Sequence, residues 1–132
     1  MSLPFIHDRL AVTAAWFIFI LGVWALVQRV RSRPLDSGWF GAAMIAEGLI
    51  VVQALIGAYL YFFMGLGAAL PRPFMHILYG LVAGITLPAA WGYFNSLQRE
   101  GVKGLAMGVT CIFLWGILLR ASSTALYLPP GL

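Results

Sequence analysis

The chain has 132 residues, of which 62% are hydrophobic and only 9% are charged, and its net charge is +4. A soluble domain has to cover its core with polar surface, so this composition excludes that class and indicates an integral membrane protein. The basic residues lie in short loops and at helix ends rather than on one polar face, which argues against nucleic acid as a partner.

The chain contains four apolar stretches, at residues 9–28, 39–63, 75–94 and 104–120. Each is close to the roughly 20 residues that a membrane-spanning helix needs. We therefore predict an all-α membrane protein with one domain, residues 1–132, folded as an antiparallel bundle of four transmembrane helices. The first stretch is followed by arginines rather than by a cleavage site, so we expect it to stay in the mature protein.

The basic residues predict the topology of this bundle. One side holds Arg29, Arg31, Arg33, Arg99 and Lys103, and the other side holds Arg9, Arg72 and Arg120. Cytoplasmic loops carry an excess of Lys and Arg. We therefore expect a multi-pass protein of the plasma (inner) membrane with both termini extracytoplasmic.

Two histidines, His7 and His76, each stand at the opening of an apolar stretch and head a run of small residues at offsets of four, seven and eight. These small residues are Ala11, Ala14 and Ala15 after the first histidine, and Gly80, Ala83 and Gly84 after the second. Such offsets fall on one helical face. Because both helices run from outside to inside, we expect the imidazoles to face each other near the outer surface.

Opposed imidazoles above flat helical faces are typical of a membrane cytochrome, in which a porphyrin lies between helices. We predict one haem b per chain, with its iron bound by His7 and His76 and its ring against the small residues. The propionates need cations or water, and Arg9, Arg72 and Arg120 at the same end are the candidate partners.

Other interpretations of the same residues stay open. The small-xxx-small spacing also lets membrane helices pack closely without any cofactor, which would make the chain a structural accessory subunit of a membrane oxidoreductase. Zinc is a weaker alternative, because it prefers about four ligands and this end adds only Asp8 to the two histidines.

Two polar residues interrupt the second apolar stretch. Gln53 faces the bundle or an edge of the cofactor, and polar contact between helices is its simplest role. Glu47 is an intramembrane carboxyl group, which is costly unless it is protonated or paired. It is either neutral and hydrogen-bonded to Trp24 or Thr110, or it carries a proton or contacts a partner subunit.

Residues 52–58 (VQALIGA), an outer loop and residues 75–78 (MHIL) resemble the heme A synthase family. The half-bundles of that family carry a Gln-x-x-x-Gly helix followed by a helix that opens with His-Leu. Residues 7–11 (HDRLA) are similar to the His-Arg-x-x-small opening of the family's preceding ligand helix. The resemblance implies that His7 and His76 are axial haem ligands on the extracytoplasmic side.

The family consists of two such halves, and it places a catalytic glutamate three residues before the first histidine, where this chain has Pro4. We therefore expect electron transport in a respiratory or photosynthetic complex rather than catalysis. The expected partners are other membrane subunits or a second copy of the chain, with a quinone as a further candidate. A half-size haem-modifying enzyme is the remaining enzymatic alternative.

Overall fold

The computed structural model describes residues 2–65, 73–97 and 99–125. This part of the chain forms the helices α1 (Leu3–Val30), α2 (Ser37–Phe62), α3 (Pro73–Phe94) and α4 (Glu100–Ala125). All four are long and apolar enough to cross a membrane. The expected all-helical, multi-pass architecture is therefore confirmed, although α1 begins six residues before the apolar stretch that predicted it.

Short polar side chains cap the first two helices. The Ser2 hydroxyl accepts a hydrogen bond from the Phe5 N–H at 3.4 Å, and the Asp36 carboxylate accepts one from the Trp39 N–H at 2.9 Å. Such caps satisfy N–H groups that have no partner inside the helix. Since α1 starts at Leu3, His7 is the fifth residue of the helix, and helical residues both precede and follow it.

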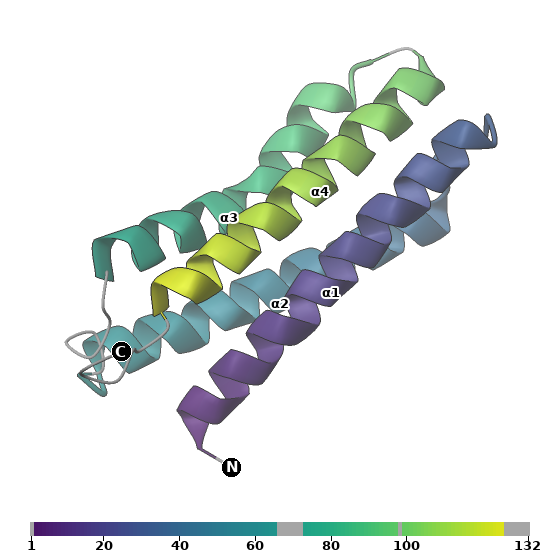
Figure 1. The fold of residues 1–132 in the computed structure, drawn as a ribbon. Coiled ribbons are helices and arrows are strands. Elements are labelled where there is room, and N and C mark those ends of the chain that lie inside the picture. The colour runs from purple at the N-terminus through teal and green to yellow at the C-terminus, as the bar shows by residue number, and fades with distance from the viewer. Residues whose placement is uncertain (1, 66–72, 98, 126–132) are drawn as a thin grey trace.

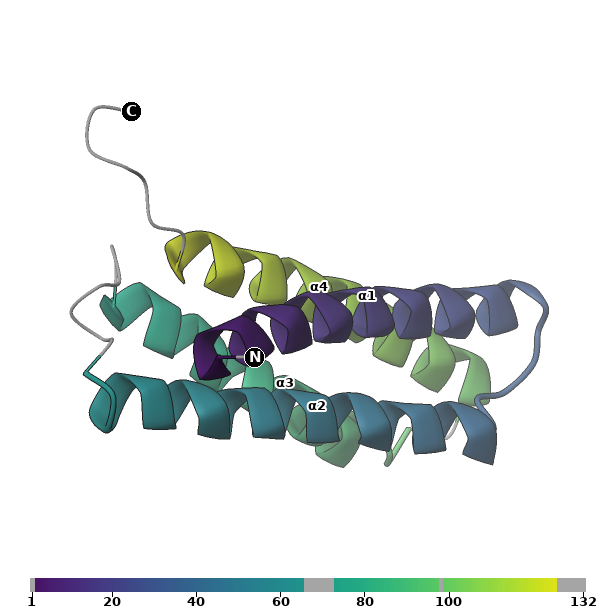
Figure 2. The ribbon, with the colours of Figure 1, turned by 90° about the horizontal axis from the view of Figure 1, so that it is seen from below.

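The helices run alternately in opposite directions, so that α1 begins and α4 ends at the same end of the bundle (Figure 1). We call this the histidine end, because His7 and His76 lie within the first two turns of α1 and α3. The opposite end holds the turns at residues 31–36 and 95–99, and we call it the arginine end. A view from a second side shows the same up-and-down arrangement (Figure 2).

The helices form a closed ring of neighbours. Helix α1 packs against α2 and α4, and α3 completes the ring by packing against α4 and, over a smaller contact, α2. Helices α1 and α3 are therefore diagonal to each other. Side chains that point inward from both of them meet in the interior of the bundle.

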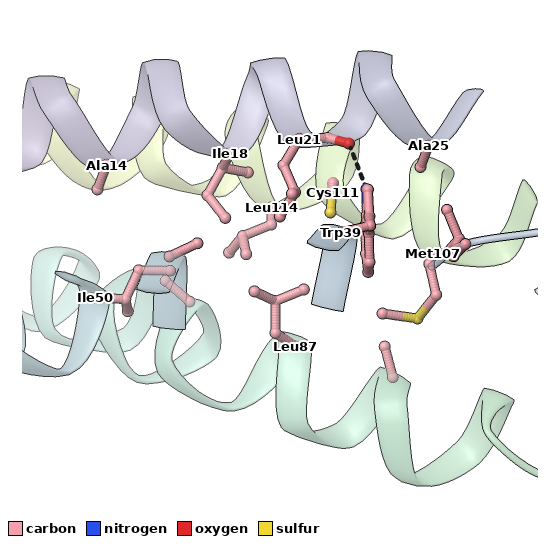
Figure 3. Close-up of a cluster of buried hydrophobic side chains, with 14 residues drawn as sticks. Ala14, Ile18, Leu21, Ala25, Trp39, Ile50, Leu87, Met107, Cys111 and Leu114 are labelled. Carbon is pink, nitrogen blue, oxygen red and sulfur yellow. Dashed lines mark hydrogen bonds between the residues drawn. The ribbon is translucent and has the colours of Figure 1, made fainter. Parts of the chain in front are cut away.

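The core lies along the middle of the bundle and toward the arginine end (Figure 3). Trp39 is completely buried there, and its indole N–H donates a hydrogen bond to the carbonyl of Leu21 at 3.0 Å. Ile18, Leu87 and Leu114 pack in the same cluster. The outer surface is apolar as well, with many large exposed side chains, among them Trp16, Ile20, Met44, Leu55, Phe62, Leu81, Ile85 and Phe113. An outer face of this kind suits lipid.

The closest helix contact is between α1 and α4, and glycine makes it possible. A Cβ atom on Gly108 would lie 2.8 Å from a side-chain carbon of Leu26, and one on Gly22 would lie 3.0 Å from the Cβ of Cys111. Small residues let membrane helices approach in this way. The sequence interpretation placed close packing only on the stripes below the histidines, and it missed this pair.

Candidate cofactor site at the histidine end

The two histidine rings are partly buried and lie next to each other, as expected from their matching positions. Their centroids are 6.3 Å apart and their planes differ by 73°, so the rings do not stack. A metal held at about 2 Å by one nitrogen of each of two opposed imidazoles separates the ring centroids by roughly 6 Å. The observed spacing is therefore compatible with one shared metal ion.

Helix α4 sets the orientation of His76. The ring nitrogen Nδ1 lies 2.8 Å from the backbone carbonyl oxygen of Ala121. A carbonyl oxygen can only accept, so Nδ1 carries the hydrogen and Nε2 carries the free lone pair. Metal-bound histidines commonly donate their other N–H group to a carbonyl in this way. His76 thus has the tautomer that a metal ligand needs.

Helix α2 provides the surface against which His7 lies. A Cβ atom on Gly57 would be only 3.0 Å from Cε1 of the His7 ring, so the ring rests on the helix backbone. The ring also interacts with the backbone of Gln53, one turn earlier. Its Nδ1 atom is buried and has no hydrogen-bond partner. A buried ring nitrogen without a partner is uncommon in proteins and is a candidate ligand atom.

Gln53 adds a second unsatisfied atom at the same place. Its Oε1 is buried without a partner, and the third such side-chain atom among the described residues is Oε2 of Glu47. Two of these three unsatisfied atoms therefore belong to His7 and to Gln53, whose backbone contacts the His7 ring. All four helices contribute to this site: α1 and α3 the rings, α2 a glycine surface and an amide, α4 a carbonyl.

The two stripes of small residues differ in their surroundings. On α1, Ala14 and Ala15 are buried, and Ala11 is partly exposed. On α3, Ala83 is buried, while a Cβ atom at Gly80 or Gly84 would meet nothing within 4 Å. The α1 stripe is thus largely packed into the core, whereas open space remains beside the glycines that follow His76.

The described arginines of the histidine end lie over aromatic rings. The guanidinium carbon of Arg9 is 5.1 Å from the ring centroid of Phe5, and that of Arg120 is 5.8 Å from the ring centroid of Tyr79. Arg120 directly precedes Ala121, the residue bound to His76. Arg72 lies outside the described residues.

Glu47 takes no part in this site. Its Oε2 atom is buried without a hydrogen-bond partner. The hydroxyl group of Thr110 donates instead to the carbonyl of Ala106, at 2.7 Å. The Thr110 hydroxyl thus donates to its own helix and not to Glu47, which was one of the alternatives for this carboxyl group.

The ligand set limits which metals fit. Among residues 2–65, 73–97 and 99–125, no group of three or more His, Cys, Asp or Glu side chains could hold a metal ion. Zinc takes three or four protein ligands, and this part of the chain does not bring them together. A metal bound by these two histidines needs further ligands from elsewhere, and the porphyrin nitrogens that bind haem iron are one such source.

Comparisons of the chain with protein-family models, with curated proteins and with solved structures found no match. The resemblance of the histidine segments to heme A synthases therefore stays a prediction. The function has to be argued from the geometry of this site.

Proposed function

We propose that this chain is a membrane cytochrome, which binds one haem b between His7 and His76 and transfers electrons within a respiratory or photosynthetic membrane complex. One observation carries the proposal: the centroids of the two partly buried rings lie 6.3 Å apart. The bond from His76 to Ala121 and the unsatisfied Nδ1 of His7 support it, because each leaves one ring nitrogen free for iron.

The residues of the chain have separate tasks in this proposal. His7 and His76 hold the iron, and the Ala121 carbonyl and the Gly57 surface keep their rings in place. Arg9 and Arg120 supply positive charge for the propionates, as would Arg72. Bound haem supplies one-electron redox chemistry, and axial ligation and burial set its potential.

The orientation and the partners belong to the same proposal. Five basic residues at the arginine end favour that end as cytoplasmic, which places the histidine end and both termini outside, in the plasma (inner) membrane. Within residues 2–65, 73–97 and 99–125, little of the chain lies outside the four helices. Electrons therefore come from other membrane subunits or from a second copy of the chain, with a quinone as a further candidate donor.

A reduced-minus-oxidised optical spectrum of the purified protein tests the proposal. We expect a sharp α band and about one haem per chain, and we expect His7→Ala and His76→Ala each to remove the band. Thr13→Ala is the matched control, because Thr13 is exposed on the same helix as His7. Each variant must reach the membrane in the same amount as the wild type.

A flat spectrum of the wild-type protein, including after addition of haem, would contradict the proposal and leave the structural subunit as the better interpretation. Mass spectrometry of the extracted haem separates the enzymatic alternative. We expect unmodified haem b, whereas a chemically altered haem that disappears in His76→Ala would identify a haem-modifying enzyme.

A further inference from the structure

The arginine end has a second feature, which involves neither histidine. The turn between α3 and α4 forms a shallow surface hollow lined by Ser96, Leu97, Arg99 and Val102. Two of these side chains are polar and two are apolar. The Ser96 hydroxyl already donates to the carbonyl of Tyr93 at 3.0 Å, so Arg99 is the hydrogen-bond donor that this lining presents outward.

Two arginines lie around the start of α4, whose first residue is Glu100. Arg29, from the end of α1, lies against the first turn of α4, with its guanidinium carbon 3.5 Å from the position of a Cβ atom on Gly101. Arg99 precedes the helix and is exposed. The positive end of the α4 dipole points to the same place. Asp36 lies at the same end, and its carboxylate accepts a hydrogen bond from the Trp39 N–H at the start of α2.

An apolar track continues from the hollow along α4 into the membrane span. Val102, Leu105, Val109 and Phe113 follow one another at steps of three or four residues, and all four are exposed. Such spacing puts them on one helical face. Trp91, exposed near the end of α3, marks the level of the lipid headgroups, where tryptophan is enriched.

We propose that the hollow and this track bind one anionic phospholipid. The phosphate lies at the hollow, where Arg99 contacts it and Arg29 adds charge, and the acyl chains lie along the track on α4. A soluble anion would use the arginines but not the track. A zwitterionic lipid carries the same phosphate, but its headgroup also has a positive charge, which the arginines disfavour. The combination of cations above an exposed apolar face is complementary to an anionic lipid.

Separate titrations with two lipids in detergent solution test this site. Purified protein is titrated with spin-labelled phosphatidylglycerol and, separately, with spin-labelled phosphatidylcholine, and the immobilised fraction is measured. We expect clear preference for phosphatidylglycerol, and we expect Arg99→Gln and Arg29→Gln each to weaken its binding about fivefold, the effect of one basic residue near a membrane surface. Arg33→Gln, in the turn between α1 and α2 and outside the lining of the hollow, is the control and should bind as the wild type does.

Three results would overturn the proposal: equal binding of the two lipids, an equal loss in Arg33→Gln, or displacement of phosphatidylglycerol by millimolar inorganic phosphate. The last result would identify a site for a soluble anion. Detergent solution removes any effect of these variants on membrane orientation. The readout is independent of haem, so this proposal and the proposed function can fail separately.

Discussion

Gly57 allows a test of the histidine site with a single methyl group. In Gly57→Ala the new Cβ atom would lie 3.0 Å from Cε1 of His7 and 3.6 Å from its Nε2. Carbon atoms in contact prefer about 3.5–4.0 Å, so the ring has to retreat by a few tenths of an ångström. Metal–ligand distances tolerate only about 0.2 Å. The substitution therefore moves the ring farther than a bond to iron allows.

We expect Gly57→Ala to weaken haem binding roughly 10- to 100-fold, the range found when residues that support metal ligands are changed. The assay is a titration of haem-free protein with haem in detergent, followed by absorbance. Gly48→Ala is the control, because Gly48 lies on the same helix and an added Cβ would meet nothing within 4 Å. Equal haem affinity in the two variants would refute the reasoning about the His7 position.

Three further substitutions test the packing of the bundle by thermal unfolding in detergent. Gly108→Leu should destabilise the protein by about 1–3 kcal/mol, because it overpacks the contact between α1 and α4. Gly116→Leu is the control and should not, since nothing lies within 4 Å of a Cβ atom there. Equal unfolding temperatures of the two variants would show that the contact between α1 and α4 is loose. Trp39→Phe removes the N–H donor of a 3.0 Å bond to α1, and we expect a loss of about 1 kcal/mol or more, with an unchanged unfolding temperature as the contrary outcome. Glu47→Gln replaces a carboxyl group whose Oε2 is buried without a partner, so the variant should be at least as stable as the wild type because charged groups are costly within a membrane; a clear loss of stability would instead point to a structural role for the carboxyl group.

Much of the site could be predicted from the sequence, because the relevant signals are local. The offsets from His7 to its small residues and from His76 to its own are those of one helical face, and two helices of the same direction bring equivalent positions to equal depth. Gln53 could be identified because a polar side chain within an apolar span is costly unless it has a partner or a function.

The partners of those residues could not be predicted. The carbonyl of Ala121 that orients His76 is 45 residues away in the chain and belongs to the backbone, which has no residue-specific signature. The role of Gly57 depends on which face of α2 meets α1. Gly22 and Gly108 could have been noticed as small residues, but many glycines of this chain border open space instead.

Apolar length and the turns between the stretches are properties of the residues alone, and they are sufficient for four membrane-crossing helices that alternate in direction. Hydropathy acts on each segment separately, so it needs no knowledge of the neighbours. Which helices contact each other is determined only by the tertiary structure, because it depends on how the surfaces of all four helices fit together. This arrangement put α1 and α3 on a diagonal, brought the two imidazoles within 6.3 Å of each other and left one nitrogen of His7 without a partner.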